Sequence, residues 1–335
     1  MRYILPLLVS LGLMPSAYAH DQQTLMKSFF SVVMVRGYNA DGGLAYGSGV
    51  MIGKNEVLTN CHIFRVTKEP WVSQGEDIYR ITAVKADRWH DLCLLTTETL
   101  PSNPSEVGKS GELQKGQEVY AVGHSGGSAS AITSMGNVRS LYDFDHGNII
   151  RSDTRFSLGA SGSGLFNSAG QLVGINTFKT IGKVAYYYAV PVDWLEELRK
   201  QPDDKFPIIG KTFWEEDEDK KAFFLQMAVP ELNEDWPKLA EVSERWTKAE
   251  PQSSEAWYEL GNAQEKMDRS KEAEEDYRKA VSLNGRNIDA LFRIGVIASQ
   301  KGDKDEVHEI ELALMGIDKD IADQFSEAAG CTAQC

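Results

Sequence analysis

The sequence lacks any excess of basic residues. It holds 35 Lys and Arg against 49 Asp and Glu, which gives a formal net charge of -14. Because binding to phosphates needs a basic surface, neither half of the chain suits a nucleic acid. Residues 1–200 contain 18 basic and 18 acidic residues, whereas residues 201–335 contain 17 and 31. This asymmetry predicts two domains with different surfaces.

Long apolar runs are missing beyond the N-terminus. The first residues are Met-Arg, an apolar stretch follows over residues 4–14, and residues 17–19 read Ala-Tyr-Ala. This order is typical of an export signal, and the stretch is too short to span a bilayer. No cysteine follows it where a lipid could be attached. We expect residues 1–19 to be cleaved and the mature protein to be periplasmic or secreted; the alternative is a buried N-terminal strand or helix.

Short β-branched or aromatic runs, separated by turn residues, fill residues 29–190. They cover residues 29–35, 49–52, 78–84, 92–95, 119–122 and 172–177. Many short strands without helical stretches between them indicate an antiparallel sandwich or barrel. A short helix is expected over residues 192–200, where acidic residues come early and Arg-Lys come last.

The composition of the sequence changes at residue 203. Residues 203–220 are acidic and predict a linker, and the sequence beyond them is helical with a period of 34 residues. At that spacing Trp257 matches Leu291, and Gly261 matches Gly295. The pattern resembles the tetratricopeptide repeat, in which bulky residues fill the gap between two helices that small residues allow to approach. We therefore expect helical repeats over residues 221–320 and a tail over 321–335; the alternative is an ordinary helical bundle.

Three short segments contain candidate catalytic residues. Ser161 lies in a Gly-Ala-Ser-Gly turn, His62 follows a β-rich run, and Asp91 opens an apolar strand. Each is a weak signal alone, since a glycine-rich loop, a structural histidine and a surface aspartate are common. A serine, however, becomes a nucleophile once a neighbouring base takes its proton, and the attacked carbonyl then needs backbone N–H donors.

In combination, these segments resemble the HtrA/Deg type of chymotrypsin-like serine protease. The chain reads GSG at 47–49, LTNCH at 58–62, DLCLL at 91–95, GASGS at 159–163, LFN at 165–167 and GQLVGIN at 170–176. The resemblance covers about residues 29–200. It implies a chymotrypsin-like double β-barrel over residues 20–202, so that the whole chain is a multi-domain β + α protein.

The resemblance also implies the roles of these residues. Ser161 would attack the scissile carbonyl, His62 would act as its base, and Asp91 would hold the imidazole. The backbone N–H groups of Gly159 and Ser161, with Ala160 as a further candidate, would hold the oxyanion. Ser163 is a minor rival nucleophile, but no glycine lies two residues before it. The family usually carries a PDZ domain after the protease, and helical repeats stand there instead.

Substrate preference is less evident from the sequence. The positions that form the pocket wall in this family match Arg155, Phe156 and residues 175–177, which are Ile175, Asn176 and Thr177. If Phe156 lines the pocket, an apolar side chain is preferred; if Arg155 points inward, an acidic one is. The alternative, which we favour, is an Arg155–Asp153 pair on the surface.

The remaining histidines and cysteines give weaker expectations. His90 is expected to face solvent because it neighbours Asp91 on a strand. His124 and His146 lie in loops without metal-ligand spacing, so no metal or other cofactor is predicted. Cys61 and Cys93 flank the base and the acid and would either form a disulfide or remain small buried hydrophobes. Cys331 and Cys335 in the tail stay unassigned.

Together these observations predict an exported serine endopeptidase that acts on protein or peptide substrates. The helical repeats would recruit a protein partner, and their acidic surface favours a basic or extended peptide. The main alternative is a binding scaffold with a degenerate protease domain. An esterase with the same triad is a third reading, although the residue order typical of α/β-hydrolases is absent.

Overall fold

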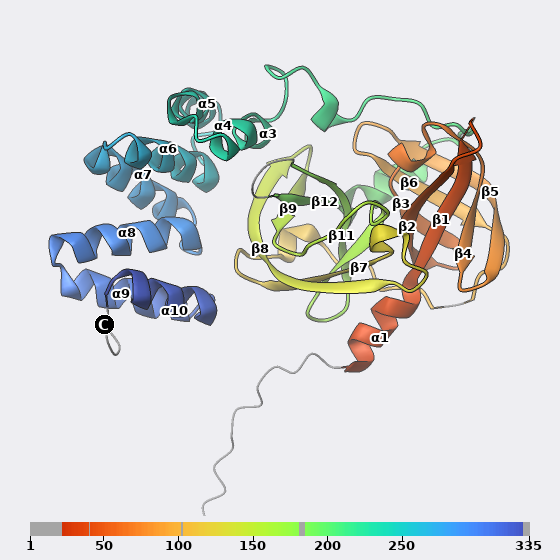
Figure 1. Cartoon of the computed structure of the whole chain (residues 1–335), viewed down its shortest axis with the longest axis horizontal. Helices are drawn as coiled ribbons and strands as arrows, with labels where there is room; N and C mark the ends of the chain where they lie inside the picture. Colours follow the sequence, from red (N-terminus) through yellow and green to blue (C-terminus); the bar gives the residue numbers. More distant parts are fainter. Residues whose placement is uncertain (1–21, 40, 102, 181–184, 331–335) are drawn as a thin grey trace, which may run out of the picture.

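The computed structural model describes residues 22–39, 41–101, 103–180 and 185–330. Two β-barrels form its first part and a stack of helices its second (Figure 1). The predicted signal at residues 1–19 lies outside the described residues, as do Cys331 and Cys335. No helix in the described part is both long and apolar enough to cross a membrane.

The first barrel closes six strands in the order β1-β2-β3-β6-β5-β4. These are β1 (Val32–Asn39), β2 (Leu44–Gly53), β3 (Glu56–Thr59), β4 (Thr67–Gln74), β5 (Asp77–Asp87) and β6 (Leu92–Thr97). All pairings between them are antiparallel, and the interior is filled by buried aliphatic side chains such as Val35, Val57 and Leu95. A helix, α1 (Gln22–Ser31), precedes β1, so the strand predicted from residue 29 begins only at residue 32.

The second barrel repeats this architecture in the order β10-β11-β12-β9-β8-β7. Its strands are β7 (Glu118–Gly123), β8 (Ile132–Phe144), β9 (Gly147–Ser152), β10 (Ser163–Asn167), β11 (Leu172–Lys179) and β12 (Tyr187–Pro191). The expected terminal helix appears as a 3-10 turn (Val192–Trp194) followed by α2 (Leu195–Lys200). The predicted chymotrypsin-like double β-barrel is therefore confirmed, because each closed barrel hydrogen-bonds all of its strand edges.

The acidic segment 203–220 connects the barrels to the helices, and it is packed rather than free. Its backbone N–H groups donate to first-barrel carbonyls, from Asp204 to Val84 (2.7 Å) and from Ile208 to Phe64 (3.1 Å). Further on, a 3-10 turn (Phe213–Glu215) places Trp214 in a stack on Phe178 of the second barrel, with ring centroids 4.6 Å apart. The segment thus ties both barrels together on its way to the repeats.

The helical part consists of short helices followed by antiparallel pairs. Its helices are α3 (Phe223–Gln226), α4 (Ala228–Leu232), α5 (Trp236–Ala249), α6 (Ser254–Lys266), α7 (Ser270–Leu283), α8 (Ile288–Lys301), α9 (Lys304–Met315) and α10 (Lys319–Ala328). Helices α6 and α8 begin 34 residues apart, as do α7 and α9, in agreement with the predicted period. A Cβ atom at Gly261 or Gly295 would approach the Tyr277 or Phe325 ring within 2.8 or 2.4 Å, so the small residues do permit close helix contact.

The predicted tail at 321–335 is wrong for its first part. Helix α10 continues to residue 328, and its Ala322 and Phe325 are buried against the repeats. The helix packs there because these two apolar residues, three apart, lie on one face.

A buried ion cluster joins the repeats to the second barrel. The ammonium group of Lys115, whose side chain is 3% exposed, lies 3.2 Å from a Glu255 carboxylate oxygen and 3.0 Å from one of Asp289. It also donates to Asn287 Oδ1 at 3.1 Å. A buried charge needs close partners of opposite charge. The first turns of α6 and α8, which carry Glu255 and Asp289, therefore bind Lys115 of the second barrel.

Candidate active site

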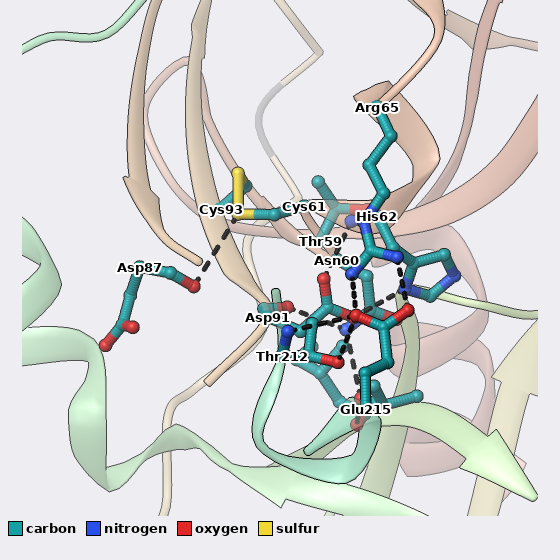
Figure 2. Close-up of polar contacts among 12 residues, drawn as sticks. Thr59, Asn60, Cys61, His62, Arg65, Asp87, Asp91, Cys93, Thr212 and Glu215 are labelled. Atoms are coloured by element: carbon teal, nitrogen blue, oxygen red, sulfur yellow. Dashed lines mark hydrogen bonds and ion pairs between the residues drawn. A yellow bond between two sulfur atoms is a disulfide. The ribbon is translucent and has the colours of Figure 1, made fainter. Parts of the chain in front are cut away.

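His62 and Asp91 meet on the first barrel. Strand β3 leads into a 3-10 turn (His62–Phe64), and Asp91 directly precedes β6, which pairs with β3. His62 Nδ1 lies 2.5 Å from Asp91 Oδ2, and the His62 backbone N–H donates to Asp91 Oδ1 at 2.7 Å (Figure 2). The Asp91 side chain is 0% exposed and that of His62 is 27% exposed. The buried carboxylate therefore fixes an imidazole that remains open to solvent on one side.

The backbone of Asp91 is itself held in place. Its φ angle is +58°, a left-handed conformation that few residues other than glycine adopt. The Asp91 carbonyl accepts from the Asn60 side chain at 3.0 Å and from the Cys61 N–H at 3.3 Å. Asn60 also donates to Thr177 Oγ1 in the second barrel at 3.0 Å. The buried Asn60 thus links the aspartate to both barrels, a role that the sequence reasoning missed although Asn60 lies within the LTNCH segment.

A disulfide joins Cys61 to Cys93, with Cα atoms 5.0 Å apart (Figure 2). One sulfur precedes His62 and the other follows Asp91 by two residues. The bond closes a span of 32 residues and so cross-links the two segments that carry the histidine and the aspartate. Of the two alternatives that the sequence left open, the structure has the disulfide.

The Ser161 loop lies against the same side of the first barrel. The Ser161 carbonyl accepts from the Ser48 N–H at 2.7 Å, and Ser48 Oγ donates to the Gly159 carbonyl at 3.0 Å. A Cβ atom built on Gly47 would lie 3.0 Å from the Ser161 oxygen and 2.4 Å from the Ile63 side chain. The Ser161 loop and the His62 turn are therefore neighbours, although no hydrogen bond joins the Ser161 and His62 side chains among the described residues.

Within residues 159–162, two backbone N–H groups have no partner in the described part of the chain. They belong to Gly159 and Ser161, whereas the Ala160 N–H donates to the Ser157 carbonyl at 3.0 Å. Gly159 has φ +91°, and a Cβ atom there would lie 2.6 Å from the Tyr46 ring and 2.8 Å from the His124 carbonyl. Only glycine fits at position 159. The Ala160 N–H is not available to an oxyanion, because it already donates to the Ser157 carbonyl.

The predicted pocket residues divide into two groups. Arg155 is exposed, but Asp153 pairs with Arg139 (2.5 Å) rather than with Arg155, so the favoured surface pair is wrong. Phe156 is half-buried and packs edge-on against Tyr187, with centroids 5.0 Å apart. Arg155 and Phe156 therefore lie at the protein surface, in the loop that precedes Ser161.

The other three residues, Ile175, Asn176 and Thr177, are buried in strand β11. Ile175 is 0% exposed within the core of the barrel, so it does not line a surface pocket. Asn176 donates its side-chain N–H to Ser163 Oγ (3.0 Å), and Thr177 Oγ1 accepts from Asn60. The side chains of Asn176 and Thr177 therefore make hydrogen bonds within the protein and do not face a substrate pocket. Ser163, the rival nucleophile, is buried by the same packing.

His90 differs most from its expectation. Its ring stacks on Trp194 with centroids 3.8 Å apart, and its two nitrogens lie 2.6 Å from Asp87 Oδ2 and 3.2 Å from Asp145 Oδ2. The prediction that it faces solvent is wrong, because residues 88–91 form a turn in which strand alternation does not hold. Among the described residues, no cluster of His, Cys, Asp and Glu could hold a metal ion.

The connecting segment reaches the edge of this site through Glu215. Both Arg65 Nη atoms donate to its carboxylate at 2.5 and 2.6 Å, three residues beyond His62 (Figure 2). The Thr212 backbone N–H and hydroxyl also bond Glu215. The hydrogen bonds from Arg65 lower the pKa of Glu215 to about 2 from its ordinary value of 4.5.

This ion pair predicts a pH-dependent contribution to stability. Since the carboxylate pKa is lower in the folded chain, the stabilisation is complete above about pH 4.5 and is lost as the pH falls toward 2. We expect the Glu215→Gln variant to melt below the wild type at pH 7 and to match it near pH 2, measured by circular dichroism. Glu218→Gln, which removes only an exposed pair with Lys221, serves as the control. A gap that is unchanged down to pH 2 would contradict the assignment.

The architecture is similar to that of known proteases. Residues 47–175 match the trypsin-like peptidase domain family, and residues 254–287 match the tetratricopeptide repeat family. The solved active form of the Rv3671c protease from M. tuberculosis superposes with a TM-score of 0.50 at 18% identity, covering 62% of this chain and 97% of that one. At this identity the likeness shows the fold alone.

Curated proteins of similar sequence are named serine endoproteases. The probable periplasmic serine endoprotease DegP-like of Hahella chejuensis is 30% identical over 167 residues, which is 47% of this chain and 35% of the relative. Serine endoprotease DegS of Haemophilus influenzae is 32% identical over 183 residues, 49% of this chain and 52% of the relative. The chain thus spans between a third and about half of the length of these relatives. The chain therefore carries a trypsin-like peptidase domain with HtrA-type homologues, followed by a tetratricopeptide repeat.

Proposed function

We propose that this chain is an exported serine endopeptidase in which Ser161, His62 and Asp91 form the catalytic triad. The observation that carries the proposal is the 2.5 Å contact between His62 Nδ1 and the buried Asp91 carboxylate, next to the Ser161 loop. The two relatives are serine endoproteases by name, and the one from Hahella chejuensis is a probable periplasmic one, which supports both the activity and the export of the mature chain. The N-terminal sequence pattern supports cleavage of residues 1–19.

The proposed reaction follows from the roles of these groups. Ser161 Oγ attacks the scissile carbonyl while His62 Nε2 takes its proton, and the His62 imidazolium then returns that proton to the leaving amine. Asp91 accepts from the His62 Nδ1–H and stabilises the imidazolium. Water then hydrolyses the acyl-enzyme on Ser161 with His62 again as base. No cofactor enters this chemistry.

A casein digestion assay tests the activity. We expect the wild-type protein, from residue 20 onward, to degrade casein and the Ser161→Ala variant to leave it intact. Circular dichroism verifies that both proteins are folded. Equal residual degradation by both would assign the activity to a contaminant and favour the alternative of a binding scaffold.

The two unpartnered N–H groups of Gly159 and Ser161 form the proposed oxyanion hole. We expect Gly159→Ala to lower kcat by about 10²–10³-fold, because a Cβ atom clashes with Tyr46 and strains φ, which moves one donor. Gly126→Ala, at a positive φ with no atom within 4 Å of its Cβ, is the matched control. A Gly159→Ala variant with the kcat of the control would rule out this oxyanion hole.

Asn60 is the proposed positioning residue for Asp91. Removing its side chain leaves the buried Asp91 carbonyl with only the Cys61 N–H as donor, which costs about 0.5–1.5 kcal/mol. We expect Asn60→Ala to reduce kcat roughly tenfold or more with little change in KM. Asn167→Ala, which removes comparable turn hydrogen bonds in the β10–β11 loop, should leave kcat near the wild-type value. An effect on KM alone would contradict a positioning role.

The helical repeats are proposed to contact a protein partner or substrate. Helices α6 and α8 already hold Lys115 of the second barrel, so a partner has to use other surface of the repeats.

A further inference from the structure

A cleft of about 700 Å³ separates the second barrel from the first repeat helices. One wall is the β8–β9 hairpin, residues 141–148. The opposite wall combines α3 with the end of α5 and the start of α6. In Figure 1 these helices lie beside the β8–β9 side of the barrel. The cleft is therefore built from both domains, and none of the proposed triad residues lines it.

The charges that line this cleft are all of one sign. Asp143, Asp145, Glu250 and Glu255 contribute carboxylates, and no lysine or arginine lines it among the described residues. Glu255 is neutralised by Lys115, but the other three carboxylates face no ammonium or guanidinium group in the described structure. Asp145 accepts from Trp89 and His90, Glu250 accepts from the Trp246 indole, and Asp143 has no side-chain partner in the described part of the chain.

Two half-buried rings, Phe144 and Phe223, line the cleft beside these carboxylates, and the buried rings of Tyr142, Phe224 and Trp246 pack behind them. Tyr142 stacks on Phe224 with centroids 4.6 Å apart, and Phe223 stacks on Trp246 at 6.2 Å. Tyr142 is 3% exposed, and its hydroxyl finds no hydrogen-bond partner among the described residues. Ring faces next to carboxylates attract cations, and a guanidinium group gains most because it is planar and stacks.

The structure already contains two contacts of this chemistry. Glu255, at the base of the cleft, binds the ammonium group of Lys115 at 3.2 Å. The Arg245 guanidinium lies over the Phe223 ring, 5.9 Å from its centroid. Carboxylates and rings of this cleft thus accept basic side chains of the protein itself.

We propose that this cleft binds an arginine-rich or lysine-rich segment of a protein ligand, with arginine preferred. Asp143, Asp145 and Glu250 supply the charge complementarity, and the half-buried rings of Phe144 and Phe223 supply the preference for arginine. The site does not depend on peptide hydrolysis, because neither its walls nor its carboxylates belong to the proposed triad.

Calorimetric titration of the Ser161→Ala chain tests the proposal without turnover. We expect acetylated, amidated hexa-arginine to bind more tightly than hexa-lysine, and hexa-glutamate not to bind. The double variant Asp143→Asn/Glu250→Gln should weaken the hexa-arginine Kd about tenfold, since each exposed charge pair contributes up to about fivefold. Binding should also weaken as salt rises from 50 to 300 mM.

A matched double variant separates this site from diffuse attraction to an acidic protein. Glu241→Gln/Glu244→Gln removes the same charge from exposed positions of α5 that do not line the cleft. We expect its Kd to stay within twofold of that of the Ser161→Ala parent. Equal weakening by both double variants, or no weakening by Asp143→Asn/Glu250→Gln in a folded protein, would overturn the proposal. Equal Kd values for hexa-arginine and hexa-lysine would overturn the role of the rings.

Discussion

Replacement of His62 by alanine is expected to lower kcat for peptide hydrolysis by about 10⁶-fold. The hydroxyl of Ser161 is a weak nucleophile until a base takes its proton, and His62 is the imidazole next to its loop. Without the imidazole, Asp91 also loses the group that it orients. The loss is measured with a fluorogenic peptide under single-turnover conditions.

His308 provides the matched control for this variant. It is an exposed histidine on α9, and His308→Ala should keep kcat within twofold of the wild type. A His62→Ala variant that retains a tenth of the wild-type kcat, in a preparation free of other proteases, would contradict the role of His62 as base.

The Asp91→Asn variant is expected to lower kcat by about 10⁴-fold at neutral pH. The Asp91 carboxylate accepts from both the ring and the backbone N–H of His62, so it favours the Nδ1–H tautomer and leaves Nε2 free to act as the proposed base. An asparagine amide can present N–H toward Nδ1, which favours the opposite tautomer. Fluorogenic peptide hydrolysis, with circular dichroism to verify folding, measures this loss.

The chain offers a close control in its second histidine–aspartate pair. Asp87 Oδ2 lies 2.6 Å from His90 Nδ1, much as Asp91 meets His62, but His90 stacks on Trp194. We expect Asp87→Asn to change kcat less than tenfold. If the Asp87 and Asp91 variants lose activity equally, the loss reflects structure and not the tautomer of one catalytic imidazole.

Much of the fold could be predicted because its signals are local. The alternation of β-branched runs with turn residues located β1, β2, β5, β6, β7 and β11, and the 34-residue period located α6 to α9. The resemblance to the HtrA type supplied the pair His62 and Asp91, which the structure places in contact. Strand β1 begins three residues later than predicted because Phe29 and Phe30 belong to the last turn of helix α1, which ends at Ser31.

What could not be predicted depends on contacts between distant segments. His90 lies in a turn whose partners, Asp145 and Trp194, belong to the second barrel. Residues 203–220 look like a linker because their composition is acidic, yet Arg65 and Phe178 hold them. Asn60 gains its role only where Asp91 and Thr177 converge. Composition and periodicity carry no information on such pairs.

Covalent labelling at Ser161 tests the central claim most directly. The wild-type protein is treated with a fluorophosphonate, digested and analysed by mass spectrometry, beside His62→Ala and Ser161→Ala. We predict one labelled residue, Ser161, in the wild type, with labelling strongly slowed in His62→Ala and absent in Ser161→Ala. A folded wild-type protein that stays unlabelled, or that carries the label at Ser163 or another serine, would contradict the proposed active site.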